Sequence, residues 1–174
     1  MAKRLAKTAL LCALSLIAFT IENLFPPLFI PGARLGVGNV FVILCLIYYG
    51  YGSALTVLTA KCILSAIFQG NVFSAVYALS AGAVSITVTY VLLRFAGEKV
   101  SLTSVSALSA CLHNLVQLVV FMLITESFGM LAYAPYLALV GCVSGVFTGF
   151  LCGLTVKRDF RFFRDDGINA ETKQ

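Results

Sequence analysis

Nine polar or ionisable side chains interrupt otherwise apolar stretches of the sequence, and their types suit the binding of a small polar molecule. They are Glu22, Arg34, Asn39, Lys61, Gln69, Asn71, His113, Asn114 and Gln117. Carboxylate, ammonium and carboxamide groups are costly in hydrocarbon, so a set of them within a membrane protein indicates a functional site. Carboxamides both donate and accept hydrogen bonds, which orients a polar ligand.

The spacing of these residues places several of them on shared helix faces. Gln69 follows Lys61 by eight residues and Gln117 follows His113 by four, with Asn114 beside His113. Positions four apart lie one above the other along a helix, so each set forms a polar stripe. The sequence therefore predicts two polar helix faces that can meet at one site.

The composition requires a membrane around these residues. Hydrophobic residues make up 60% of the 174-residue chain and charged residues only 11%, and the mean hydropathy is +1.00. A soluble domain cannot cover its surface with so few charged groups. The net charge of +5 is then a signal of membrane topology, and nucleic-acid binding is not expected because no basic face belongs to a soluble domain.

Apolar segments of roughly 20 residues, the length that crosses about 30 Å of hydrocarbon, predict an all-α integral membrane protein with six transmembrane helices. The expected spans are residues 8–25, 35–49, 53–68, 72–93, 102–125 and 135–156. The second and third are short and meet at Gly50 and Gly52, so one long buried hairpin is the alternative. Residues 1–156 form one domain, and residues 157–174 form a basic tail that we expect to be disordered.

Lysine and arginine residues set the orientation. They precede the first span, lie between the fourth and fifth, and follow the sixth, as Lys3, Arg4, Lys7, Arg94, Lys99, Lys157, Arg158, Arg161 and Arg164. The positive-inside rule makes these segments cytoplasmic, so both termini are expected on the cytoplasmic side of a bacterial plasma membrane. Helix directions then place Glu22, Asn39, Gln69, His113 and Gln117 in the outer half, with Lys61 and Ser80 near the middle. The predicted site is a pocket open to the outside.

Two features of this pocket allow two interpretations each. Residues 26–39 carry three prolines and three glycines, which indicates either a lid over the pocket or an ordinary external loop. Glu22 either pairs with Lys61 or Arg34 or is a solvated cap, and pairing is favoured because a cation at mid-depth needs a partner. Phe25, Phe29 and Tyr77 are candidates for apolar walls.

Small residues recur at every fourth position on two helices. The last span carries Gly141, Gly145, Gly149 and Gly153, and the first carries Ala9 and Ala13. Such faces let helix backbones approach closely within lipid. Packing inside the protein is the favoured interpretation for the glycines, and docking of a separate membrane subunit is the alternative.

Catalysis and cofactor binding are not expected. The sequence has no phosphate-binding G-x-x-x-x-G-K-[ST] motif, and its six cysteines and single histidine lack metal-ligand spacing. Aspartate-rich magnesium sites, which hold diphosphate groups in enzymes, are not expected either, because the only aspartates are Asp159, Asp165 and Asp166 in the tail. We expect neither an enzyme nor a metal or cofactor site.

Four segments resemble the Gx transporter family, whose members are often labelled heptaprenyl diphosphate synthase component I. They are residues 31–39 (Pro-Gly-Ala-Arg-Leu-Gly-Val-Gly-Asn), Lys61, residues 79–82 (Leu-Ser-Ala-Gly) and residues 113–117 (His-Asn-Leu-Val-Gln). The resemblance spans roughly residues 8–156. Two departures stand out: the family pattern has arginine in place of Lys61, and Lys-Leu-Gly-Leu-Ala-Asn in place of residues 34–39.

This family is related in fold to the substrate-binding S components of energy-coupling factor (ECF) transporters. The resemblance implies a protein that captures a small solute, such as a vitamin, a flavin or a quinone-related precursor. A membrane coupling subunit with ATPases would then reorient it for import, docking on the alanine face of the first helix. The alternative is a non-catalytic accessory subunit in polyprenyl diphosphate or quinone synthesis, or in flavin-based electron transfer.

Overall fold

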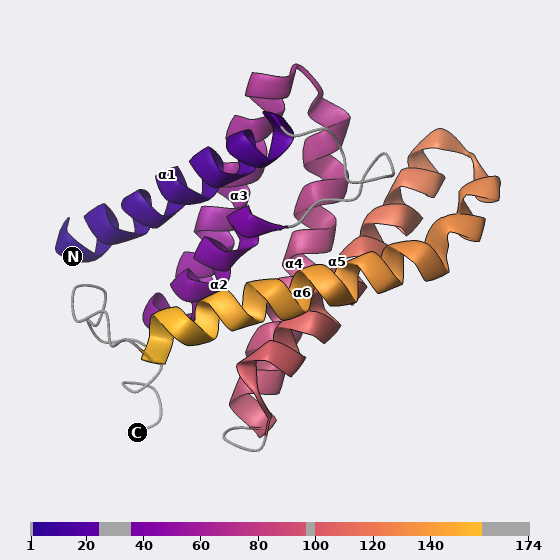
Figure 1. Cartoon of the computed structure of the whole chain (residues 1–174). Helices are drawn as coiled ribbons and strands as arrows, with labels where there is room; N and C mark the ends of the chain where they lie inside the picture. The colour runs from indigo at the N-terminus through magenta and orange to yellow at the C-terminus, as the bar shows by residue number, and fades with distance from the viewer. Residues whose placement is uncertain (1, 25–35, 97–99, 158–174) are drawn as a thin grey trace.

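A computed structural model of the chain describes residues 2–24, 36–96 and 100–157, and these residues fold into helices (Figure 1). In chain order the elements are α1 (Ala2–Leu24), α2 (Val37–Tyr49), α3 (Tyr51–Gln69), α4 (Val72–Ala96), α5 (Leu102–Thr125), the short 3-10 helix η2 (Phe128–Tyr133) and α6 (Ala134–Lys157). No strand occurs among the described residues. The predicted all-α class is confirmed.

Five stretches of helix are long and apolar enough to cross a membrane: Lys3–Glu22, Tyr51–Gln69, Val72–Phe95, Leu102–Thr125 and Phe128–Lys157. The prediction of six spans differs from this at α2. With 13 residues, α2 is about 20 Å long, which is shorter than the roughly 30 Å of a hydrocarbon core. The finding supports a multi-pass membrane protein in which α2 is a shorter, internal helix.

Local sequence explains where the helices begin and end. α1 begins six residues before its predicted start, because Lys3, Arg4 and Lys7 are good helix formers although they are not apolar. Gly50, at φ 83°, ends α2 and begins α3, and Gly70, at φ 66°, ends α3. Left-handed backbone of this kind favours glycine. At the start of α5, the Ser101 side chain accepts a hydrogen bond from the Ser104 N–H at 3.1 Å.

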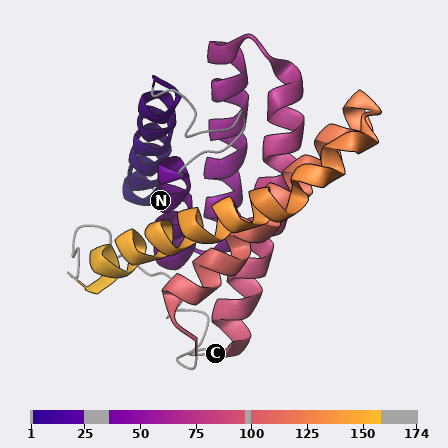
Figure 2. The same ribbon diagram turned by 45° about the vertical axis from the view of Figure 1, so that its right-hand side comes forward.

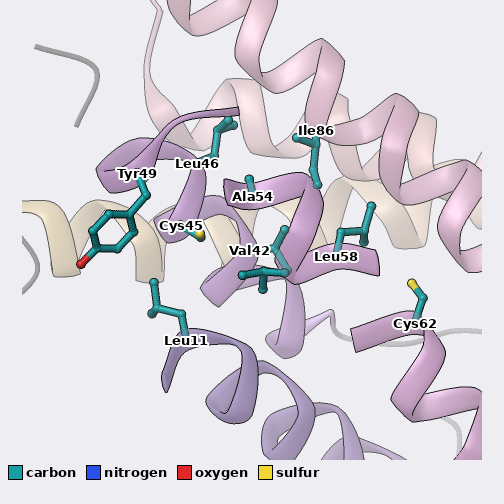
Figure 3. Packing of buried hydrophobic residues seen from close by; sticks show 10 residues of the cluster. Leu11, Val42, Cys45, Leu46, Tyr49, Ala54, Leu58, Cys62 and Ile86 are labelled. Carbon is teal, nitrogen blue, oxygen red and sulfur yellow. The ribbon is translucent and has the colours of Figure 1, made fainter. Parts of the chain in front are cut away.

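The helices form two groups that diverge at one end. α1 to α4 lie together, while α6 crosses in front of them and the α5–α6 hairpin leans away at its η2 end (Figures 1 and 2). A cluster of apolar side chains joins α1 to α4, with Leu11, Leu46, Leu58 and Ile86 each contributed by a different helix (Figure 3). This core fills the half of the bundle next to the start of α1.

Two basic residues from helix ends, Arg4 and Arg94, lie at this same end. An Arg4 guanidinium nitrogen donates to the Tyr49 carbonyl at 2.5 Å, which places the start of α1 at the α2–α3 junction. Tyr51, just after that junction, packs its ring 5.3 Å from the Tyr90 ring, and Tyr90 accepts a hydrogen bond from Arg94. We call this end of the bundle the basic end.

Hydroxyl groups connect α4 to α5 within the bundle. The Ser109 hydroxyl oxygen lies 2.8 Å from the Ser85 hydroxyl oxygen and 2.7 Å from the Thr89 hydroxyl oxygen. Ser109 is 2% exposed and Thr89 1%. Their mutual hydrogen bonds satisfy groups that would otherwise be costly in an apolar interior.

The outer surface is strongly apolar, as lipid contact requires. Ile67, Phe68, Phe95 and Leu123 are each more than 60% exposed, and they lie on three different helices. A water-soluble protein rarely exposes so many large apolar side chains. The surface agrees with the composition in indicating a protein embedded in a bilayer.

Candidate functional site

A cavity of about 80 Å³ lies between the α1–α4 group and the α5–α6 hairpin, in the half of the bundle away from the basic end. Residues from all six α-helices and from Gly36, which precedes α2, line it. Six of the residues predicted for the site are among them: Glu22, Asn39, Lys61, His113, Asn114 and Gln117. Helix packing has brought together polar groups that are up to 95 residues apart in the sequence.

Lys61 supplies a positive charge inside the cavity wall. Its side chain is only 7% exposed. The ammonium nitrogen donates to Asn39 Oδ1 at 2.8 Å and lies 5.6 Å from the centre of the Phe19 ring. A carboxamide oxygen and an aromatic face both stabilise a cation. The charge is therefore held within the bundle and does not extend toward a membrane surface.

Gly38 makes room for this ammonium. A Cβ atom at residue 38 would lie 3.0 Å from Lys61 Nζ and 2.9 Å from the Ser15 carbonyl oxygen. The Ser15 hydroxyl, which is fully buried, donates to the Gly38 carbonyl at 2.6 Å. The backbone of α2 therefore approaches α1 and the Lys61 side chain more closely than a residue with a side chain would allow.

Gly36 connects the start of α2 to α1 and α6. Its N–H donates to Glu22 Oε1 at 2.7 Å, and its carbonyl accepts from the Asn39 N–H at 2.8 Å. The residue has φ 70°, and a Cβ atom there would lie 3.2 Å from Ser144 Oγ. Both the left-handed backbone and the close neighbour favour glycine. Two of the glycines in the predicted lid segment thus shape the cavity wall.

The α5 face of the cavity carries one imidazole and two carboxamides, from His113, Asn114 and Gln117. Asn114 Nδ2 donates to the Leu137 carbonyl of α6 at 3.0 Å, so this side chain also joins the two helices of the hairpin. Its Oδ1 atom is chemically an acceptor. The face offers both donors and acceptors to a ligand.

Aromatic and hydroxyl side chains complete the wall. Tyr77 lines the cavity as predicted and packs edge-on against Phe121, with ring centres 6.2 Å apart. Sequence reasoning missed Phe19, Ser74 and Ser144, which also line it. Phe19 is three residues before Glu22, so helical spacing from a recognised polar residue was the signal that could have found it.

Two of the predicted site residues that the structure describes, Gln69 and Ser80, do not line the cavity. Gln69 is exposed at the end of α3. Ser80 is half-buried and donates to the Val76 carbonyl of its own helix at 2.8 Å, so its hydroxyl is used locally. Arg34 lies outside the described residues, as do Phe25 and Phe29 and most of the predicted lid.

The glycines of α6 differ in their surroundings. Cβ atoms at Gly141, Gly145 and Gly149 would lie 2.5–2.9 Å from atoms of α5, whereas one at Gly153 would meet nothing within 4 Å. The first three therefore permit close packing of α6 on α5. Ala9 and Ala13 of α1 are exposed and contribute nothing to the cavity.

The side chains that line the cavity can form polar contacts with a small molecule. Within the described ranges, no group of three or more His, Cys, Asp or Glu residues is placed to hold a metal ion. A buried ammonium, a carboxylate, three carboxamides and aromatic walls are typical of a site that orients a small polar molecule.

Comparison with known proteins identifies one family. The sequence model of the family described as heptaprenyl diphosphate synthase component I matches residues 11–155, which is most of the chain. The match confirms the family resemblance found from the motifs. No curated protein matches the sequence, and no solved structure does.

Proposed function

We propose that this chain, which belongs to the heptaprenyl diphosphate synthase component I family, is a membrane protein that captures a small polar solute in the cavity between α1–α4 and the α5–α6 hairpin. The observation that carries the proposal is the convergence of Lys61, Asn39, His113, Asn114 and Gln117 on one cavity. Ionisable groups inside a membrane protein are retained where they serve a function.

The distribution of polar groups favours capture over a channel. A channel needs a polar path through both halves of the membrane. Here the half next to the basic end is occupied by the apolar cluster that includes Leu11, Leu46 and Leu58, and the Ser85–Thr89–Ser109 hydroxyls bond to one another. A cavity closed at one end suits a protein that binds its solute and then changes conformation.

The direction of capture follows from the charges. Lys3, Arg4, Arg94 and Lys157 lie at helix ends away from the cavity, and the positive-inside rule makes their side cytoplasmic. The cavity then faces the exterior. The solute would be a vitamin, flavin or quinone-related precursor, as in the related S components, and an ATP-driven partner complex would complete its import.

A second candidate function is a membrane accessory subunit for polyprenyl diphosphate or quinone synthesis, or for flavin-based electron transfer. The family description, which names a synthase component, favours it. The exposed row of Ala6, Ala9 and Ala13 on α1 is a face on which a helix of a partner can pack closely, in this function as in the first. In this function too the chain assists a partner and performs no catalytic step.

Ligand retention tests the capture function. The full chain is purified in mild detergent, and bound molecules are identified by native mass spectrometry and by extraction. We expect one kind of small molecule, bound at no more than one copy per chain. Gln117→Ala should reduce the retained amount at least about tenfold, because the loss of an orienting hydrogen bond to a buried polar group costs about 1.4 kcal/mol or more. Gln69→Ala, at an exposed position, is the matched control and retains the wild-type amount. Equal retention in both variants, or none in the wild type and no stabilisation by any vitamin, flavin or quinone precursor, contradicts capture.

Co-purification tests the accessory function. Affinity-tagged chain is isolated from its native membrane with Ala9→Leu and Ala13→Leu combined, which blocks the small-residue face of α1. Loss of a prenyl-synthesis or electron-transfer partner supports this function, with Ala132→Leu, an exposed alanine on η2, as the control. An unchanged partner yield in the double variant rejects docking through α1.

A further inference from the structure

We propose that the basic end of the bundle binds the phosphate group of an anionic phospholipid at the α2–α3 junction, through the guanidinium groups of Arg4 and Arg94. This site lies in the half of the bundle away from the cavity. It goes beyond the proposed function and is independent of the solute that the cavity captures.

Two arginines from different helices are held at this junction by tyrosines. Arg4, on α1, donates to the Tyr49 carbonyl at 2.5 Å, and its guanidinium carbon lies 5.9 Å from the centre of the Tyr49 ring. Arg94, on α4, donates to the Tyr90 hydroxyl, and its guanidinium carbon lies 5.8 Å from the centre of the Tyr90 ring. The Tyr90 ring in turn packs 5.3 Å from the ring of Tyr51. The aromatic faces stabilise both cations beside the junction.

Each guanidinium group has donors left for an anion. A guanidinium carries five N–H groups in a planar fork, and each contact described above uses one nitrogen. Both arginine side chains are exposed. A guanidinium binds phosphate oxygens through two parallel hydrogen bonds, which the ammonium group of lysine cannot form. The charge and the shape of these groups therefore favour phosphate.

The backbone at the junction favours an anion and leaves room for a headgroup. Among the described residues, no side chain caps the start of α3, whose first N–H groups point out of the helix. The N-terminal end of a helix stabilises negative charge. A Cβ atom at Gly50 or Gly52 would meet no atom of the described residues within 4 Å. A phosphate group can therefore approach the backbone here.

Apolar side chains beside the two arginines identify the anion as part of a lipid. Leu5, which follows Arg4, is 72% exposed, and Phe95, which follows Arg94, is 83% exposed. A soluble anion gains nothing from such surfaces, whereas the acyl chains of a phospholipid pack on them. Basic residues next to transmembrane helices attract anionic lipids, and tyrosines are enriched at the depth of the lipid headgroups.

A lipid titration followed by native mass spectrometry tests the site. The full chain is stripped of lipid in detergent and titrated with phosphatidylglycerol, which is anionic, or with phosphatidylcholine, which has no net charge. The wild type is expected to bind its first phosphatidylglycerol at least about tenfold more tightly than phosphatidylcholine. Equal affinity for the two lipids overturns the proposal.

Arg94→Gln tests the guanidinium contact without disturbing the packing of helices, because Arg94 and Tyr90 belong to the same helix. It is expected to weaken phosphatidylglycerol binding at least about tenfold, since charge-assisted hydrogen bonds to phosphate are lost. Lys3→Gln removes the same charge at an exposed position beside Arg4, and as the control it should weaken binding by less than about threefold. Similar losses in the two variants would show a diffuse attraction to the whole basic end and overturn the site.

Arg4→Lys tests the planar fork, because it keeps the charge and loses the two parallel hydrogen bonds. We expect weaker phosphatidylglycerol binding than in the wild type, with an unchanged midpoint of thermal unfolding in the absence of lipid. Unchanged lipid affinity in this variant would remove Arg4 from the site and overturn the proposal.

Inorganic phosphate distinguishes a lipid site from a site for a soluble anion. Added in excess to the complex with phosphatidylglycerol, it is expected to leave the lipid bound, because it lacks acyl chains that bury apolar surface. Displacement of the lipid by phosphate would assign the site to a soluble anion and overturn the lipid as its occupant. Retention of the cavity solute should be unchanged in Arg94→Gln, so a failure of this proposal leaves the capture function intact.

Discussion

The position of the Lys61 ammonium depends on the absence of a side chain at residue 38. A methyl group there would lie within 3.0 Å of both the ammonium and the Ser15 carbonyl. Residues 38 and 61 each belong to one of the two departures that the family resemblance led us to expect, the segment 34–39 and Lys61, and the structure places them next to each other. They form one local arrangement, in which the smaller residue on α2 accommodates the ammonium from α3.

Gly38→Ala should therefore displace the charge and strain the α1–α2 contact. We expect a loss of about 1–3 kcal/mol in stability, typical of overpacking in a close-packed interior, together with weaker retention of the cavity ligand. Gly52→Ala is the matched control, because a Cβ atom at Gly52 meets nothing within 4 Å and alanine favours the helix by up to about 1 kcal/mol. Thermal unfolding and ligand retention measure both effects, and equal behaviour of the two variants would refute the proposed role of Gly38.

Two buried serines on α5 provide a second comparison. Ser109 bonds to Ser85 and Thr89, whereas Ser106 Oγ is buried without a hydrogen-bond partner among the described residues. Ser109→Ala should lower the free energy of unfolding by about 0.5–1.5 kcal/mol, since it breaks the α4–α5 connection. Ser106→Ala removes an unsatisfied hydroxyl and should leave stability unchanged or slightly higher. Detergent denaturation curves compare them, and a larger loss in Ser106→Ala would contradict the assignment.

Helix α6 packs on α5 along part of its glycine row. A Cβ atom at residue 145 would lie 2.5 Å from both the Ala107 Cα and the Ser106 carbonyl oxygen, whereas one at residue 153 would meet no atom within 4 Å. The contact is between backbones, so neither helix can yield by rotating a side chain. The regular spacing of the four glycines does not by itself reveal this difference.

Gly145→Ala should force the α5–α6 hairpin apart and reduce stability by about 1–3 kcal/mol or prevent folding. Gly153→Ala, on the same helix, should be tolerated. Yield of monodisperse protein in detergent, followed by thermal unfolding, distinguishes the two. Similar loss in both variants would indicate that the glycines act through helix propensity and not through packing.

The short helix α2 contacts both the cavity and the apolar core. Its 13 residues include buried Val42, Cys45 and Leu46, which contact α1 and α3 in the apolar cluster. The first turn of the helix carries the cavity contacts, and its last turn meets the basic end through Tyr49. α2 therefore links the site to the core and, by Cys152 Sγ donating to the Val40 carbonyl at 3.6 Å, to α6.

The distribution of charged residues over the molecule predicts its orientation in the membrane. Fluorescent protein fused after Lys157 should fluoresce, because that helix end is expected in the cytoplasm. Alkaline phosphatase inserted at Gly70, between α3 and α4, should be active, because that turn is expected outside. Replacing Lys3, Arg4 and Lys7 by glutamine should weaken the preference for this orientation. Inactive phosphatase at Gly70 with a dark C-terminal fusion would reverse the topology and the direction of capture.

Much of the architecture could be predicted from the sequence alone, because helix formation in a membrane is dictated locally. Apolar length and the absence of charges determine which segments cross the bilayer, since each backbone group must be satisfied within its own helix. Charged ends and glycine breaks also have local causes. The polar residues of α5 share a face because His113 and Gln117 are one turn apart, whatever surrounds them.

Only the tertiary structure decides which residues line the cavity. Periodicity tells which side chains share a face but not which neighbouring helix covers that face. Gln69 and Lys61 belong to one stripe, yet α3 ends at Gln69 and leaves it exposed, while α1 and α2 enclose Lys61. Phe19 and Ser144 join the site because helix crossing brings α1 and α6 to it. The sequence alone predicts a helical membrane protein with polar groups in its interior. The close packing of helices at small residues such as Gly38 and Gly145 decides which of those polar groups meet.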